Sequence, residues 1–169
     1  MIVQRASQRA GVPWRNGLGV QFEICATTGW RLSTADLTTD VQFSVFDGVT
    51  REFCVAQGNG VILAINGETH RCELESITVF DGAADVNCAL LNGSAKALNL
   101  MVPHGEAPVH LHICKFGEII EQHVAIVAIG GPALLRNQSG NGIELDLLDA
   151  VIDSREIFTV DQGAVAVLQ

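Results

Sequence analysis

The stretch from residue 61 to residue 74 reads Val61-Ile62-Leu63-Ala64-Ile65-Asn66-Gly67-Glu68-Thr69-His70-Arg71-Cys72-Glu73-Leu74. Two strand-like runs flank an Asn-Gly pair, and this dipeptide favours the two-residue turn whose twist matches a pair of antiparallel strands. The first run is rich in β-branched residues, which is typical of a strand. We therefore predict a β-hairpin that turns at Asn66-Gly67.

The same punctuation recurs along the chain, since Asn-Gly occurs five times, mostly between short apolar runs. More than ten short strand candidates favour a β-sandwich or barrel over alternating strands and helices. Beyond the hairpin, these candidates are residues 20–25, 30–36, 53–56, 77–80, 86–91, 97–102, 109–114, 124–129, 134–137, 157–160 and 164–168. The runs 118–127 and 143–152 fit either a helix or a strand, and we favour a strand for both.

Composition and charge narrow the class of protein. The 169 residues are 48% hydrophobic and 17% charged, which suits a folded domain with a sizeable core. A net charge of -9 repels nucleic acid and anionic membranes, so we exclude both as partners. The first residues lack the apolar core of a signal peptide, and no later run is long enough to span a bilayer, which predicts a cytoplasmic protein.

The five cysteines are widely separated and show no C-x-x-C spacing. This pattern argues against a disulfide framework and against a zinc knuckle. Most of them stand among isoleucine, valine, phenylalanine and leucine, so we expect reduced thiols in the core. They are Cys25, Cys54, Cys72, Cys88 and Cys114.

The segment Val12–Gly19 has the chemistry of a recognition loop, because its proline and two glycines favour a bend. Trp14 offers an apolar wall, Arg15 a planar fork of donors for a carboxylate or phosphate, and Asn16 a donor and an acceptor. Together they could hold a small anion. The alternative is a simple turn in which Trp14 caps the core and Arg15 pairs with a surface acid, and the residue types leave both open.

Two further segments carry polar side chains among apolar ones. Alternation along residues 30–36 puts Arg31 and Ser33 on one face, which points either into a barrel or to solvent. From the residue types alone solvent is favoured, since arginine is mostly exposed. In the segment 43–51 the two phenylalanines are expected to cover the core, and Ser44 and Arg51 are its polar additions.

The motif His110-Leu111-His112 raises the question of a metal site, because two histidines two apart on a strand can reach one cation. Metal-binding cupins use such a pair with a glutamate three or four residues later. Here Glu118 follows after five intervening residues, and a shifted spacing on a strand displaces the side chain. We predict no metal site, and a metal-dependent enzyme using His110 and His112 is the alternative.

Six segments in the first hundred residues resemble, in order, the pattern of the HutD/Ves family. The segments are Val12–Gly19 with Glu23-Ile24, Trp30–Ser33, Phe43-Ser44 with Phe46 and Gly48, Gly58–Gly60, Val79–Gly82 and Leu98–Met101. The resemblance implies an all-β, cupin-type double-stranded β-helix with two barrel halves in one compact unit, which is a bicupin-like arrangement. We place the first half at residues 1–104 and the second, shorter half, packed on the first, at 105–169, near the Pro- and Gly-containing segment 103–108.

The resemblance also implies a non-catalytic protein that binds a small carboxylate, formylglutamate or urocanate, in the control of histidine utilisation. It implies no cofactor. Arg15 and Arg31 are the expected charge partners, and Trp14 is the expected apolar wall. The candidate ligand-binding residues are Trp14, Arg15, Asn16, Arg31, Ser33, Ser44, Arg51, Asn99 and Met101.

The chain departs from the family pattern where cations are expected. Gln21-Phe22-Glu23 replaces Thr-Arg-Glu, and Pro103 and His104 stand where two arginines commonly follow the methionine. With fewer cations, the pocket could bind a different ligand. The other alternative is a stress-related protein in which the pocket is vestigial. The oligomeric state is also open, a homodimer included.

Overall fold

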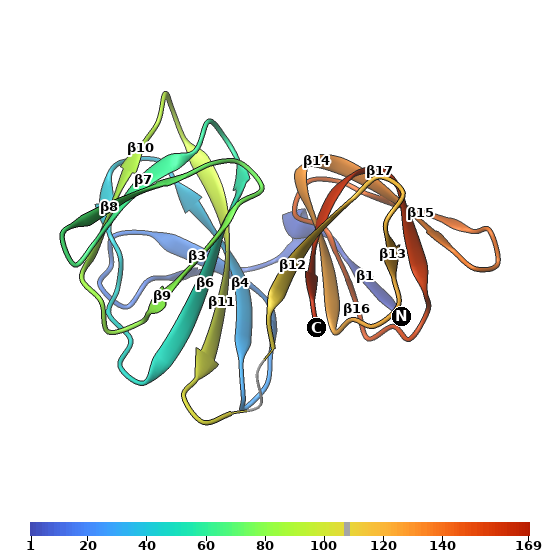
Figure 1. The fold of residues 1–169 in the computed structure, drawn as a ribbon, viewed down its shortest axis with the longest axis horizontal. Helices are drawn as coiled ribbons and strands as arrows, with labels where there is room; N and C mark the ends of the chain where they lie inside the picture. The colour runs from blue at the N-terminus through green and yellow to red at the C-terminus, as the bar shows by residue number, and fades with distance from the viewer. Residues whose placement is uncertain (107–108) are drawn as a thin grey trace. The chain divides into compact units, whose positions relative to one another are not determined.

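The computed structural model describes residues 1–106 and 109–169, and it is built almost entirely of β-strands (Figure 1). The strands form two units, one of residues Ala10–Pro108 and the other of Met1–Arg9 with Val109–Gln169. We call these the larger unit and the smaller unit. The prediction of an all-β, cupin-like fold is confirmed.

The larger unit contains two sheets of antiparallel neighbours. One sheet has the order β2-β3-β4-β11-β6-β9 and the other the order β5-β10-β7-β8. Side chains from both sheets enclose one core, in which Phe53 and Val55 pack with Val61 and Leu63. The strands are β2 (Gly11–Pro13), β3 (Val20–Ala26), β4 (Arg31–Leu37), β5 (Val41–Gln42), β6 (Val49–Gln57), β7 (Val61–Ile65), β8 (Glu68–Cys72), β9 (Ile77–Asp81), β10 (Val86–Leu90) and β11 (Ala95–Pro103).

The hairpin predicted from residues 61–74 is present. β7 and β8 pair antiparallel with Ile65 opposite Glu68, so the connection is the two residues Asn66 and Gly67. Their φ angles are 49° and 87°, and the type I′ turn requires positive φ at both positions. The prediction is therefore confirmed down to its turn.

The smaller unit is one seven-stranded sheet, whose two long strands bend. The registers of β14 and β17 shift between Ile129 and Leu134, next to Gly130-Gly131-Pro132, where glycine and proline weaken regular pairing. One side of the sheet encloses a core that includes Ile126, Leu135 and Phe158. The strands are β1 (Ile2–Gln4), β12 (Leu111–Lys115), β13 (Ile119–Ile120), β14 (Ala125–Asn137), β15 (Gly142–Leu145), β16 (Ala150–Ile152) and β17 (Phe158–Leu168).

The two ambiguous runs, 118–127 and 143–152, contain β-strand residues and no helix, so the preference for strand is confirmed. Four predicted strands merge into two longer ones. The candidates 124–129 and 134–137 are parts of the single bent strand β14, and 157–160 and 164–168 are parts of β17. The apolar runs marked the strands, but a bulge inside a strand resembles a turn in sequence.

The division between the units differs from the predicted boundary at residues 104 and 105. β1 pairs with β16, with Ile2 opposite Ile152, which joins the first nine residues to the smaller unit. Asp149 adds to this attachment, because its carboxylate accepts hydrogen bonds from Arg5 Nη1 at 2.6 Å and from the backbone N of Ala6 at 2.7 Å. In the segment 103–108, the last two residues lie outside the described residues.

Cysteine burial agrees with the expectation of core thiols. Cys54, Cys72 and Cys88 are buried free thiols, and Cys114 is a half-buried one. Burial raises the pKa of Cys54 and of Cys88 to about 12, so both stay protonated and unreactive at neutral pH.

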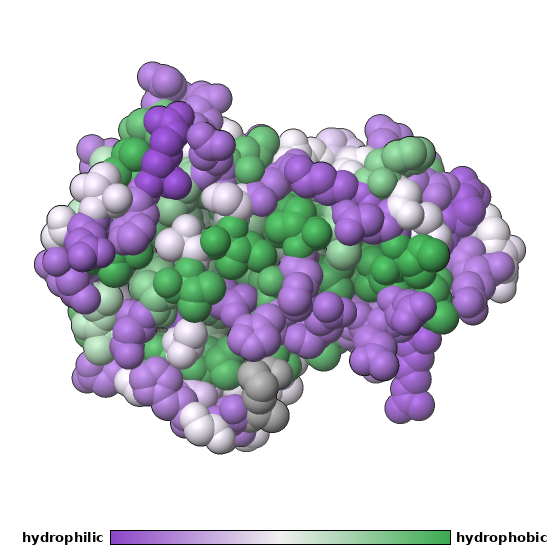
Figure 2. Space-filling view, in the orientation of Figure 1, coloured by the Kyte–Doolittle hydropathy of each residue, from purple (hydrophilic) through white to green (hydrophobic). Residues whose placement is uncertain are grey.

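The surface seen in Figure 2 is largely hydrophilic, with smaller hydrophobic areas between polar side chains. Within the described ranges, no helix combines the length and the apolar character needed to cross a bilayer.

Candidate functional site

Three neighbouring strands of the larger unit bring distant residues into rows. β11 lies between β4 and β6, and its Met101 is opposite Arg31 on one side and Arg51 on the other. Residues two apart on a strand share a face, so the next row points the same way. That row consists of Ser33, Asn99 and Phe53.

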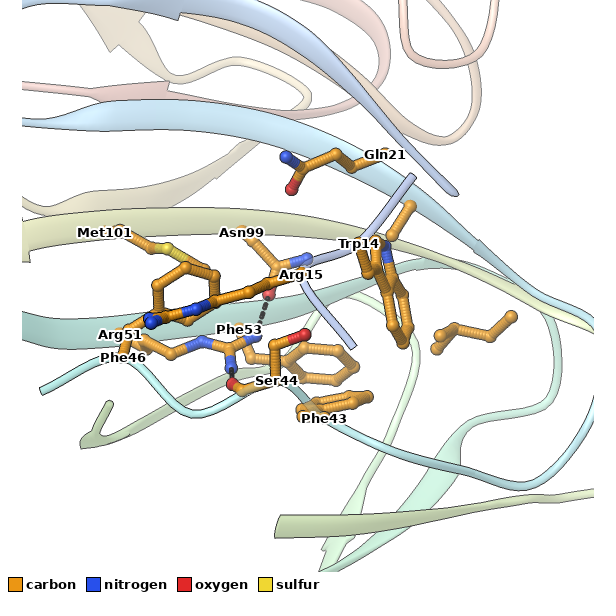
Figure 3. A pocket seen from close by; sticks show the side chains of 12 residues that line it. Trp14, Arg15, Gln21, Phe43, Ser44, Phe46, Arg51, Phe53, Asn99 and Met101 are labelled. Carbon is orange, nitrogen blue, oxygen red and sulfur yellow. Dashed lines mark hydrogen bonds between the residues drawn. The ribbon is translucent and has the colours of Figure 1, made fainter. Parts of the chain in front are cut away.

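A pocket opens over these rows (Figure 3). It has about 430 Å³ of empty space, which includes the space at its open mouth. Besides the strands, the segments around residues 14–15 and 43–46 line it. Six of the nine predicted site residues form its walls: Trp14, Arg15, Ser44, Arg51, Asn99 and Met101.

Arg51 is the most buried charged group of the pocket, with 6% of its surface exposed. Its Nη1 donates to the backbone oxygen of Ser44 at 3.3 Å, and its Nη2 donates to Asn99 Oδ1 at 3.2 Å. Its Nε is buried and has no hydrogen-bond partner among the described residues. Both hydrogen bonds are long for a cationic donor, so the guanidinium retains capacity for a further acceptor.

Aromatic rings surround the Arg51 guanidinium. Its Cζ lies 5.1 Å from the ring centre of Phe43, 5.1 Å from that of Phe80 and 5.9 Å from that of Phe46. Burial lowers the pKa of Arg51 to about 10, with a contribution from the nearby Arg31, and this value still leaves a full cation at neutral pH. No carboxylate of the described residues forms an ion pair with Arg51, so its two hydrogen bonds and the ring faces compensate for its burial.

Arg31 lies beside the pocket, in contact with two residues that line it. Its Nη2 is 3.2 Å from the sulfur of Met101, and its Cζ is 5.7 Å from the ring centre of Phe46. Arg31 is half-buried, and Ser33 is only 2% exposed. The preference for a solvent-facing position is therefore wrong for Ser33, because β4 is an inner strand of its sheet.

Asn16 does not line the pocket but fixes the loop that does. Its Nδ2 donates to the backbone oxygen of Gln42 at 2.9 Å, and its backbone N donates to Ser44 Oγ at 3.2 Å. Its Oδ1 accepts from the backbone N of Leu18 at 3.1 Å. The carboxamide thus ties the loop to the segment 42–44, and its role is to position Trp14 and Arg15.

Trp14 is the apolar wall of the pocket. Its ring packs edge-on against Phe43, with ring centres 5.8 Å apart. Gly19 lies flat against the indole, where a Cβ would come within 2.7 Å of the ring, so only glycine fits there. Arg15 extends from the same loop across the pocket in the view of Figure 3, and none of the ion pairs among the described residues includes it.

The charge distribution of the larger unit concentrates free cations at this pocket. Residues 10–108 contain eleven aspartates and glutamates and five lysines and arginines. Arg71 and Lys96 are each paired with a neighbouring carboxylate, at 3.2 Å and 2.5 Å. The other three basic side chains, which lack such an ion pair among the described residues, are Arg15, Arg31 and Arg51. The pocket is therefore a positive spot in an acidic unit.

Sequence reasoning misses several residues that line the pocket. In sequence, Gln21 of β3 is only a departure from the family pattern. Phe46 is expected to cover the core, and Phe53 is only part of a predicted strand. The alternation of residues 20–25 places Gln21 on one face, but which face is inner depends on pairing that the sequence does not give.

The two histidines of the metal alternative lie in the smaller unit. His112 is exposed on β12, and His110 precedes that strand. The carboxylate of Glu118 accepts a hydrogen bond from the backbone N of Lys115 at 2.6 Å. The described part of the chain contains no group of three or more His, Cys, Asp or Glu side chains able to hold a metal ion, so the alternative gains no support.

Comparisons with known proteins identify relatives of this chain. It is 36% identical over 105 residues to an uncharacterized 21.2 kDa protein in the hutC 3′ region of Pseudomonas putida, covering 57% of this chain and 55% of that protein. It is 35% identical over 96 residues to protein Ves of Citrobacter koseri, covering 52% and 50%. The matched part thus spans about half the length of these curated relatives.

A solved structure and a family model extend the likeness to nearly the whole chain. The structure of HutD from Pseudomonas fluorescens SBW25 matches with a TM-score of 0.80 at 24% identity, over 99% of this chain and 97% of that one, which shows a shared fold. The model of the HutD family matches residues 6–167. The chain therefore belongs to the HutD family.

Proposed function

We propose that this protein binds a small carboxylate metabolite in the pocket of the larger unit and does so without catalysing a reaction. Formylglutamate and urocanate are the candidate ligands, and the setting is the regulation of histidine utilisation. The family membership supports this setting, because the name of the family and the hutC neighbourhood of one relative both refer to hut genes.

The buried guanidinium of Arg51 is the observation that carries the proposal. Moving an unpaired cation out of water costs several kcal/mol of stability, and a protein retains such a group where the charge has a function. A carboxylate in the pocket would neutralise the charge of Arg51, which lines it. Arg31 and Arg15 would add to the attraction from the side and from the mouth.

The composition of the pocket favours binding over catalysis. Its polar lining consists of two arginines, two carboxamides and one serine, and no described lining residue is a histidine, cysteine, aspartate, glutamate or lysine. General acid–base catalysis depends on a side chain that can exchange a proton near neutral pH. The aromatic walls instead suit the flat or slender apolar part of a ligand.

Calorimetry with formylglutamate, urocanate and glutamate tests the proposal. Arg15 is exposed at the mouth, so Arg15→Ala should weaken carboxylate binding about tenfold, which corresponds to about 1.4 kcal/mol. Arg71→Ala is the matched control, because Arg71 is a surface arginine of the same unit paired with Glu73. The proposal fails if none of the three compounds binds better than about millimolar, or if Arg15→Ala binds as the wild type does.

A further inference from the structure

Gln21 is a polar group of the pocket with unused hydrogen-bonding capacity. It lies on β3, lines the pocket and is half-buried. Its carboxamide forms no hydrogen bond with a side chain or backbone group of the described residues. A carboxamide offers two N–H donors and one acceptor, so a ligand group can pair with it in both directions.

The register places Gln21 away from the cationic end of the pocket. Gln21 is opposite Ala35 of β4, two residues further along that strand than Ser33. The row of Arg31 and Arg51 is therefore two rows away from Gln21. The row between them contains Asn99, to which Arg51 donates a hydrogen bond. The row of Asn99 and the row of Gln21 are two residues apart, which is about 7 Å of strand at the usual rise of about 3.3 Å per residue. Gln21 and Arg51 are thus far enough apart to contact different parts of one ligand.

Small and apolar side chains lie between these two ends. Ala35 lines the pocket with a single methyl group, and Trp14 and Phe43 form its apolar wall. In Figure 3 the Gln21 side chain lies above the other labelled side chains, and Asn99 lies between it and Arg51 in this view. The pocket therefore has a cationic end and a neutral polar end, with apolar side chains and the Asn99 carboxamide between them.

We propose that Gln21 determines the specificity of the pocket, by selecting carboxylates that carry a neutral hydrogen-bonding group, such as an amide, at the end remote from the carboxylate. This inference rests on the proposed function, since the carboxylate is assigned to Arg51. A hydrocarbon at the remote end would displace water from the Gln21 carboxamide without replacing its hydrogen bonds, and sites built to bond a polar group strongly reject analogues that lack it.

Two monocarboxylates of nearly the same shape test this selection. One is glutaramate, the monoamide of glutarate, and the other is 5-methylhexanoate, in which an isopropyl group replaces the carboxamide. Calorimetric titration should show that the wild-type protein binds glutaramate at least about tenfold more tightly. Gln21→Leu should reduce this ratio to about one or below, and Gln21→Met, which keeps an unbranched side chain, should do the same.

Controls separate this inference from the proposed function. Gln57→Leu changes an exposed glutamine of β6, outside the residues that line this pocket, and should keep the wild-type ratio. If Arg51→Met leaves the binding of both probes unchanged, the proposed function itself fails. If both probes depend on Arg51 but Gln21→Leu keeps the wild-type ratio, only the role of Gln21 is overturned. A wild-type protein that binds neither probe, or both equally, also overturns it.

Discussion

Arg51→Met should weaken carboxylate binding by at least about a hundredfold. Arg51 is 6% exposed, and removing one partner of a buried charge pair costs about 2–5 kcal/mol, where each 1.4 kcal/mol is a factor of about ten. Methionine has a similar length and is apolar, so it fills the same space among Phe43, Phe46 and Phe80. Calorimetry of the variant with formylglutamate and urocanate measures the effect.

The same variant should leave the unligated protein as stable as the wild type, to within about 1 kcal/mol, or make it more stable. Replacing a buried charge that has no counter-ion by an apolar side chain removes a desolvation cost, which offsets the loss of two long hydrogen bonds. Urea unfolding without ligand checks this. Arg71→Met is the control, since it removes an exposed arginine of the same unit. A large loss of stability with unchanged binding would make Arg51 a structural residue.

Asp149→Asn should lower the free energy of unfolding by about 2 kcal/mol at pH 7, because hydrogen bonds to a charged group contribute about 1.5–3 kcal/mol. Burial alone would raise the pKa of Asp149, but the hydrogen bonds from Arg5, from Ala6 N and from Asp146 N outweigh it and lower the pKa below 3.8. The carboxylate attaches the first residues of the chain to the smaller unit, and asparagine keeps its shape without the charge.

The stability that the Asp149 carboxylate contributes should depend on pH. A carboxyl group whose pKa is lowered by folding stabilises the protein above its unfolded pKa, and the contribution is lost as pH falls through the folded value. The difference between wild type and Asp149→Asn should therefore be full above about pH 5 and shrink as the pH falls below 3.8. Urea unfolding at several pH values measures it, with the exposed Asp153→Asn as control. A difference that is constant with pH would contradict this role of the charge.

Local signals in the sequence are enough to predict much of the fold. The hairpin at Asn66-Gly67 needs only residues that are neighbours in the chain, because a two-residue turn with positive φ at both positions suits few other dipeptides. Period-two runs likewise mark the strands. The loop Val12–Gly19 also shows its chemistry directly, since its tryptophan, arginine and asparagine are adjacent.

Long-range pairing decides what the sequence does not show. Arg31, Arg51 and Met101 form one row only because β11 pairs with both β4 and β6, at sequence separations of about fifty to seventy residues. A shift of one residue in either register would turn the row to the opposite face. This is why Arg51, read from sequence as a polar addition to an aromatic segment, becomes the buried cation of the pocket.

The unit boundary is a second consequence of long-range pairing. Three residues at the start of the chain, Ile2–Gln4, are too few to indicate their own partner, and they pair with β16 near the other end. The effect of a departure from the family pattern also depends on the position of the residue in the fold. In sequence Gln21 only replaces a family residue, whereas its place beside Ala35 gives it a position in the pocket.

A calorimetric titration with charged and neutral compounds tests most directly whether the buried Arg51 recognises negative charge. Wild-type protein is titrated calorimetrically with formylglutamate and urocanate, each beside the neutral compound in which every carboxylate is replaced by a carboxamide. We predict that at least one carboxylate binds and that its neutral counterpart binds at least about a hundredfold more weakly. Equal affinity for the charged and the neutral compound would contradict the account.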